Sequence, residues 1–346
     1  MKVSSRLATI GATVVAALTL AACSPDIRHL EEQSAQSQSG QSGAQSADAS
    51  GPNLDDARIR RIVGEVQTVL DRAQEENDPT ILAERLTGSA LTMREGQFRR
   101  ADKTGQELEP LTISINVASA TVGDSWPRVL LVGSEASSEA PAEVYLFTQA
   151  DAQSSYMLAN WVRAVGGNSV RGVAVAEGSR ALEGDSEGFV LTPDETIAAY
   201  IEYLNDQDAE GLPEFDDPTF TPRYFEDLET LNTAVEAAGK VTAVARESEF
   251  ETMGVDLATG EALVAGSFMY THTYALTVEG ATMTVGGTAA SYLGNPDVIG
   301  TVSVSYLVNI FLTVPPEGST TPIKVVGTER AITSVSRDDD ATPEGD

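Results

Sequence analysis

Residue types that several common functions require are scarce in this sequence. Its 346 residues include one cysteine, two histidines and 22 basic residues against 52 acidic ones. A single thiol cannot form an internal disulfide or a cysteine-ligated zinc site, so stability must come from packing. A formal charge of −30 disfavours binding to nucleic acid and to anionic lipid headgroups, because both require clustered lysine and arginine.

Motifs of several enzyme classes are absent as well. The chain has no Gly-x-x-x-x-Gly-Lys, His-Glu-x-x-His or Ser-x-x-Lys pattern. These patterns cradle phosphates, bind a catalytic zinc ion and activate a serine nucleophile, respectively. We therefore expect neither a cofactor nor a metal, and we do not expect an enzyme of these types.

Long hydrophobic runs are confined to the N-terminus. Lys2 and Arg6 precede an uncharged, mostly apolar stretch over residues 7–22, and this order is typical of a secretory signal peptide. The 16 residues of the stretch fall short of the roughly 20 that span a bilayer as a helix, so cleavage is expected rather than retention.

The leader ends in Leu20-Ala21-Ala22-Cys23, which contains the only cysteine. This segment resembles the lipobox of bacterial lipoproteins. The resemblance implies cleavage before Cys23 and attachment of a diacylglycerol to its sulfur, and two or three acyl chains would hold the protein firmly at a membrane. The expected location is the outer face of the cytoplasmic membrane. The alternative is a secreted protein with a free cysteine.

Composition divides the chain into five parts. Residues 1–22 form the lipoprotein signal peptide, and residues 23–53, rich in Ser, Gln and Gly, are predicted to be a disordered tether. Two α+β domains are expected over residues 54–188 and 189–336, and residues 337–346 form an acidic tail. Removal of Lys2 and Arg6 with the leader takes the formal charge from −30 to −32.

Helices are expected to precede antiparallel strands in each domain. In the first domain, apolar residues at helical spacing predict a helix over residues 54–76 and a short one over 81–86, and a polar stretch around Arg94, Arg99, Arg100 and Lys103 separates them from the strands. Period-two alternation then predicts strands over residues 111–117, 128–132, 144–148 and 156–162.

The second domain begins at a strong helix-start signal. Thr192-Pro193-Asp194-Glu195 predicts a capping box, with proline in the first turn and acidic charge at the positive end of the helix dipole. Another helix is expected over residues 224–238. Strands are expected over residues 241–250, 261–278, 281–293, 301–314 and 323–334.

Helices followed by a long, curved antiparallel sheet, seen twice, resemble tandem NTF2-like or cystatin-like domains. Three segments are also similar to a family of uncharacterised actinobacterial lipoproteins: Tyr156-Met157-Leu158-Ala159-Asn160-Trp161, Thr192-Pro193-Asp194-Glu195 and Phe215-Asp216-Asp217-Pro218. That resemblance implies the architecture and carries no activity.

His272 is the one candidate for catalytic proton transfer. Alternation along its strand places it on the same face as Tyr270 and Tyr274, where a curved sheet could line a pocket. The other reading is a histidine packed among aromatic side chains, which we favour because the sequence marks no acidic partner.

One acidic and one basic cluster are weaker candidates for ion-binding sites. Asp206, Asp208, Glu210, Gly211, Glu214 and Asp217 approximate the spacing of a calcium loop, although Pro213 and the residues at two ligand positions depart from it. The basic cluster around Arg94 could bind phosphate or carboxylate. A solvated acidic loop and intramolecular ion pairs are the simpler interpretations.

These observations favour a membrane-anchored lipoprotein with a non-catalytic binding or scaffold role at the cell envelope and a protein or envelope partner. One alternative is a carrier of a small apolar ligand in the cone of the C-terminal sheet, around Tyr270, His272 and Tyr274. The other is an NTF2-like enzyme that uses His272.

Overall fold

The computed structural model describes residues 53–138, 140–166 and 172–341. The expected leader, the lipobox with Cys23 and nearly all of the tether lie outside these residues. Among the described helices, none combines the length and the apolar composition that a membrane span requires.

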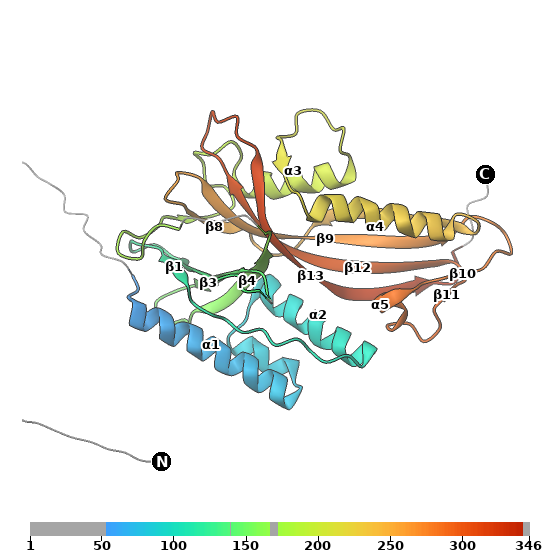
Figure 1. The fold of residues 1–346 in the computed structure, drawn as a ribbon, viewed down its shortest axis with the longest axis horizontal. Coiled ribbons are helices and arrows are strands. Elements are labelled where there is room, and N and C mark those ends of the chain that lie inside the picture. The colour runs from blue at the N-terminus through green and yellow to red at the C-terminus, as the bar shows by residue number, and fades with distance from the viewer. Residues whose placement is uncertain (1–52, 139, 167–171, 342–346) are drawn as a thin grey trace, which may run out of the picture. The chain divides into compact units, whose positions relative to one another are not determined.

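The fold is α+β, as expected, and is built on a mostly antiparallel sheet (Figure 1). Its main path runs β1-β2-β3-β4-β13-β12-β9-β8-β5, while β7 also pairs with β9 and β6 pairs in parallel with β13. A short ribbon of β10 and β11 lies apart from it. The strands are β1 (Val117–Ala120), β2 (Arg128–Gly133), β3 (Glu143–Gln149), β4 (Met157–Ala164), β5 (Ala181–Leu182), β6 (Phe215–Asp216), β7 (Gly239–Glu247), β8 (Met253–Asp256), β9 (Ala262–Leu276), β10 (Met283–Thr284), β11 (Asp297–Val298), β12 (Thr301–Val314) and β13 (Ile323–Asp338).

Three helical segments precede the strands of the N-terminal half. The helix α1 (Asp56–Glu76) buries the predicted apolar stripe, is capped by the side chain of Asp55 and ends at Asn77 in the left-handed conformation. The 3₁₀ helix η1 (Pro79–Glu84) and the helix α2 (Gly88–Thr104) follow. The sequence did not predict α2, because its buried face has few large apolar residues and includes Ser89, Arg94 and Gly96; an added Cβ at Gly96 would lie 3.0 Å from that of Ala331.

The C-terminal half contains two longer helices and one short helical turn. The helix α3 (Pro193–Asn205) has both hydrogen bonds of the predicted capping box between Thr192 and Glu195. The helix α4 (Phe220–Val235) starts four residues earlier than expected, and Asp217 accepts hydrogen bonds from the backbone of its first turn. A single turn, α5 (Gly287–Ala290), completes the set.

Two expected strands are wrong. Residues 111–115 run along α1 instead of pairing, because the side chain of Gln67 donates to the carbonyl of Leu111 and accepts from the N–H of Ile113. Residues 281–293 contain only the two-residue β10 before α5, and Gly287 in this stretch has a φ of 61°.

The sheet doubles back so that strands near its two ends share one core. Val129 and Leu131 of β2 belong to the same apolar cluster as Val255 of β8 and Leu263 of β9. The helices α1 and α2 pack on the other face of β1–β4, while α3 and α4 pack on the far face of β9, β12 and β13. The order of layers is therefore helix, strand, strand, helix (Figure 1).

The strands of the two halves join at β4 and β13. Ala164 pairs with Gly327 and Arg163 with Thr328, and one compact unit spans Ala49–Asp346. The expected domain boundary at residue 188 therefore lies inside this unit, and the sheet is continuous across it. The opposite side also closes, because Ser179, which precedes β5, donates to the carbonyl of Ala120 in β1.

The capping box of α3 yields a stability prediction. Thr192→Ala removes the hydroxyl that accepts from the N–H of Glu195, and loss of such a cap costs about 1 kcal/mol. We expect a lower free energy of unfolding by that amount in urea titrations. Thr320→Ala, at an exposed loop position, is the control and should leave stability unchanged within about 0.5 kcal/mol. Equal stabilities of the two variants would contradict the capping role.

Candidate functional site

A large groove runs along α1. It has a volume of about 1320 Å³ and lies between the first turns of α1, the β1–β3 end of the sheet and residues 172–175. Most of the lining is apolar. The apolar side chains that line it are Ile59, Val63, Ile113, Ile115, Val117, Ala118, Leu131, Ala136, Ala142, Val144, Ala164, Val173, Ala174, Val175, Ala258 and Val326.

Local sequence keeps this groove open. At Gly64 of α1, an added Cβ would meet no atom within 4 Å, so the missing side chain leaves free space along the wall. Ile115 is 38% exposed and Val117 is 54% exposed, and both belong to the lining. Large apolar side chains that are exposed together around a concavity are typical of a binding surface.

A network of charged side chains, of which Arg94 and Glu329 are buried, begins at the groove. Glu143 lines the groove from β3, and the hydroxyl of Tyr145 donates a hydrogen bond to its carboxylate. The Nε of Arg163 lies 3.9 Å from Glu143 Oε1 and 3.4 Å from Glu329 Oε2. The groove is thus connected to β13 of the C-terminal half through one guanidinium.

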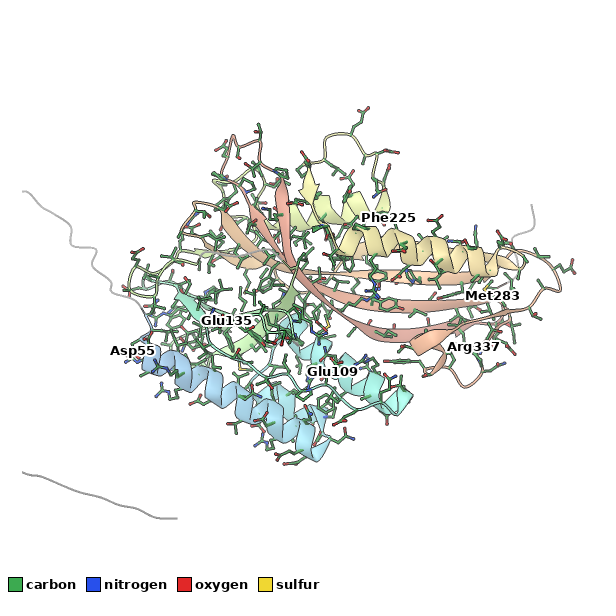
Figure 2. All side chains as sticks on the ribbon, in the orientation of Figure 1. Asp55, Glu109, Glu135, Phe225, Met283 and Arg337 are labelled. Atoms are coloured by element: carbon green, nitrogen blue, oxygen red, sulfur yellow. The ribbon has the colours of Figure 1, made fainter. Side chains whose placement is uncertain are left out.

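The network continues into α2. Gln97 donates to Glu329 Oε1 at 3.0 Å and accepts from Nη1 of Arg94 at 2.7 Å, and Nη2 of Arg94 donates to Gln74 of α1 at 3.1 Å. Arg94 is only 2% exposed. On the solvent side, Nη2 of Arg163 lies 3.1 Å from Glu109, which Figure 2 labels.

Burial shifts the titration of these groups. It raises the pKa of Glu329, with Arg163 opposing the shift, and it lowers the pKa of Arg94 to about 10. Burial, followed by the charge of Glu143, raises the pKa of Tyr145. The tyrosine therefore stays protonated and donates to Glu143. Charge-assisted hydrogen bonds and ion pairs of the network connect α2, β3, β4 and β13.

The basic cluster expected around Arg94 is not one surface. All four residues lie on α2, but Arg94 points into the network, Arg99 donates to the carbonyl of Thr333 at 2.7 Å, and Lys103 pairs with Asp102 at 3.6 Å. These contacts agree with intramolecular pairing rather than with an anion site.

Tyr270, His272 and Tyr274 lie on β9, buried beneath α4. Their exposures are 1%, 4% and 6%, and they line neither the groove nor the second cleft described below. His272 packs against Tyr270 at 5.1 Å, Tyr306 at 5.6 Å and Tyr224 at 6.4 Å between ring centroids. Tyr274 instead joins the apolar cluster at the far end of the sheet.

The surroundings of His272 keep it neutral. Burial and then the charge of Arg330 lower its pKa to about 4, and its Nε2 has no hydrogen-bond partner among the described residues. The nearest acidic influence, Asp227, is paired with Arg330 at 3.6 Å. A neutral, covered imidazole without a bonded carboxylate lacks the geometry of a general acid or base.

The acidic loop is organised by capping. The carboxylate of Asp217 accepts from the hydroxyls of Tyr200 at 2.7 Å and Thr221 at 2.6 Å, and also from backbone N–H groups of α4. The carboxylate of Asp206 accepts from the N–H of Asp208. Among the described residues, no three carboxylate, histidine or cysteine side chains are grouped so that they could hold a metal ion.

One serine lies in a motif that is found in some hydrolases. Gly184-Asp185-Ser186-Glu187-Gly188 fits Gly-x-Ser-x-Gly, the pattern of the nucleophile elbow, which requires a strand-to-helix turn and a histidine. Here the serine hydroxyl accepts from the N–H of Glu183 within a surface turn. His272, the only histidine among the described residues, is held in the aromatic cluster under α4, so the motif is a turn rather than a catalytic elbow.

The same turn borders a second cleft of about 790 Å³ near the N-terminus of α3. Its rim carries six carboxylates, and the structure places no cation among its lining residues. The rim residues are Glu183, Asp185, Asp194, Glu247, Glu249 and Glu251.

The fold and site together define a class: an α+β protein with a doubled antiparallel sheet and an apolar, half-open groove. The chain belongs to the family described as domain of unknown function (DUF8094), whose model matches residues 51–337. No curated protein and no solved structure matches the chain.

The neutral state of His272 predicts a pH dependence. Because its pKa is about 4 in the folded protein and the ordinary pKa of histidine is 6.5, the unfolded chain binds more protons between these values. The contribution of neutral His272 is complete above pH 6.5 and is lost as the pH falls toward 4. Urea unfolding should show that the free energy of unfolding falls less between pH 7 and pH 4.5 in His272→Phe than in the natural protein. Identical losses would contradict this.

Proposed function

We propose that this protein is a lipid-anchored, non-catalytic binding protein of the cell envelope, and that it takes an elongated apolar ligand into the groove between α1 and β1–β3. The observation that carries the proposal is the groove itself. Its volume of about 1320 Å³ exceeds the roughly 300–1000 Å³ of common small-molecule pockets. Its mostly apolar wall would gain about 25 cal/mol for each Å² of apolar area that a ligand covers.

The position of the groove fits an anchored protein. Asp56, Ile59 and Arg60, in the first turns of α1, line it, so the chain enters the folded part at the groove. The proposed lipid at Cys23 would hold this part at the outer face of the cytoplasmic membrane. A tether of about 30 residues reaches roughly 30 Å on average, which leaves the groove free to meet an envelope component.

The finer architecture is proposed on the same basis. Each half carries helices on one face of antiparallel strands, α1 and α2 in the first half, α3 and α4 in the second. This plan supports two fused units of NTF2-like or cystatin-like type, in a chain related to actinobacterial lipoproteins.

The alternatives centred on Tyr270, His272 and Tyr274 have less support. A carrier needs an open cone and an NTF2-like enzyme needs an accessible acid or base, whereas α4 covers these side chains and they are at most 6% exposed. Binding of a protein partner by the surface is compatible with the groove and would use the same exposed Ile115 and Val117.

Filling the groove with a large side chain should weaken ligand binding. Ala118→Trp places an indole in the lining, and Ala174→Trp does so at a more exposed lining position. We expect each variant to bind the neutral fluorophore N-phenyl-1-naphthylamine at least fivefold more weakly in a fluorescence titration. Ala237→Trp, an exposed position beyond α4, is the control. Undiminished binding in both groove variants, with unchanged melting temperatures, would refute the site.

Removing the thiol tests the anchor separately. Cys23→Ala should leave the protein without lipid and move it from the membrane fraction to the soluble extracytoplasmic fraction of its own cells, because no other residue offers the acylated sulfur. Mass spectrometry of the N-terminus gives an independent readout. Retention of the variant in the membrane fraction would rule out this anchor.

A further inference from the structure

The polar end of the groove carries more negative than positive charge. Glu109, Glu143 and Glu329 are connected through Arg163, and Arg94 is the second cation of the network. Three carboxylates thus face two guanidinium groups, and Arg94 is bonded to glutamines rather than to a carboxylate. The network is short of one positive charge at the point where it meets the groove.

Glu143 is the member that a ligand can reach. Its side chain is 20% exposed and lines the groove, whereas Glu329 is 9% exposed and is covered by Gln97 and Arg163. Arg163 lies closer to Glu109 and Glu329 than to Glu143, at 3.1 and 3.4 Å against 3.9 Å. A carboxylate has about four acceptor positions, so Glu143 retains acceptor capacity beyond its bond from Tyr145.

The groove offers no free cation to an anionic ligand. Arg60 is the only basic residue among the described lining residues, and its Nη2 lies 3.8 Å from Asp56. Glu135, which also lines the groove, has no ion pair among the described residues, and Figure 2 shows it toward the end of the molecule where α1 begins. Among the described lining residues, Glu135 thus has no paired cation, and Glu143 shares Arg163 with two other carboxylates at the longest of the three distances.

Resting on the function proposed above, we propose that the ligand of the groove is an amphiphile with a cationic ammonium end, which Glu143 binds while the apolar chain lies along α1 and β1. An ammonium group can donate to the carboxylate and supplies the positive charge that the network lacks. A carboxylate or phosphate end would meet Glu143 and Glu135 at close range and be repelled.

The test compares three probes with the same twelve-carbon chain: dodecylamine, monolaurin and laurate, cationic, neutral and anionic at pH 7. Each displaces N-phenyl-1-naphthylamine from the full mature chain, below its critical micelle concentration. We expect dodecylamine to bind at least tenfold more tightly than laurate, with monolaurin between them, because the apolar chains match in length and the polar ends are positive, neutral and negative.

Matched variants separate the local charge from the net charge of the protein. Glu143→Gln should reduce the preference for amine over laurate to threefold or less, whereas Glu229→Gln, an exposed position on α4 with the same change in charge, should retain it. Glu143→Asp keeps the charge and should preserve most of the preference. It serves as the working variant if Glu143→Gln melts at a markedly lower temperature.

The outcomes distinguish the two proposals. Equal binding of amine and laurate, or equal effects of Glu143→Gln and Glu229→Gln, overturns the cationic ligand while binding of monolaurin upholds the groove. Failure of all three probes to bind overturns both. Retention of the amine preference in Glu143→Asp together with its loss in Glu143→Gln supports the assignment, whereas an amine preference retained in Glu143→Gln overturns it.

Discussion

The junction between β4 and β13 holds the two halves of the molecule together. Only two residue pairs form it, and Gly327 is required there because an added Cβ would lie 2.4 Å from the carbonyl oxygen of Arg163. Beyond the junction the strands diverge, and two buried amides bridge the gap: Asn160 donates to the carbonyl of Gly266, and Asn309 donates to that of Trp161. Without these bonds the sheet could not double back over its own core, because buried backbone carbonyls would lack partners.

The charge network lies beside this junction and depends on it. Arg163 of β4 and Glu329 of β13 come within 3.4 Å because their strands pair at Thr328 and Gly327. Removing charges from water is costly, and the cost is offset only when geometry and further hydrogen bonds are good, as those from Gln97 and Tyr145 are. The pairing of β3 with β4 places Glu143 opposite Arg163, so the position of Glu143 at the groove depends on the strand next to the joint between the halves.

Much of the fold was predictable where the signal is local. The stripe of α1 and the capping box of α3 depend on residues three and four apart, and the structure has both. The failures occurred where a distant contact overrides alternation. Residues 111–115 alternate like a strand, but Gln67 of α1 binds their backbone, and α2 has a weak apolar stripe because it fits closely against β13. The candidate site was less predictable. His272 is packed among aromatic side chains, which is the interpretation that the sequence favoured, but the groove combines residues from α1, β1, β3 and the segment after β4 and was not predicted.

The sequence by itself determined the class of the fold, the apolar stripe of α1, the capping box that starts α3, most of its long strands and the expectation of a leader and a lipid at Cys23, because each follows from residues close together in the chain. Only the tertiary structure decided that both halves share one sheet, that His272 is covered by α4, and that Glu143 meets an apolar groove. At the charge network, β13 contacts β4 and α2 through residues more than 100 positions apart in the sequence. No local sequence pattern specifies contacts of this kind.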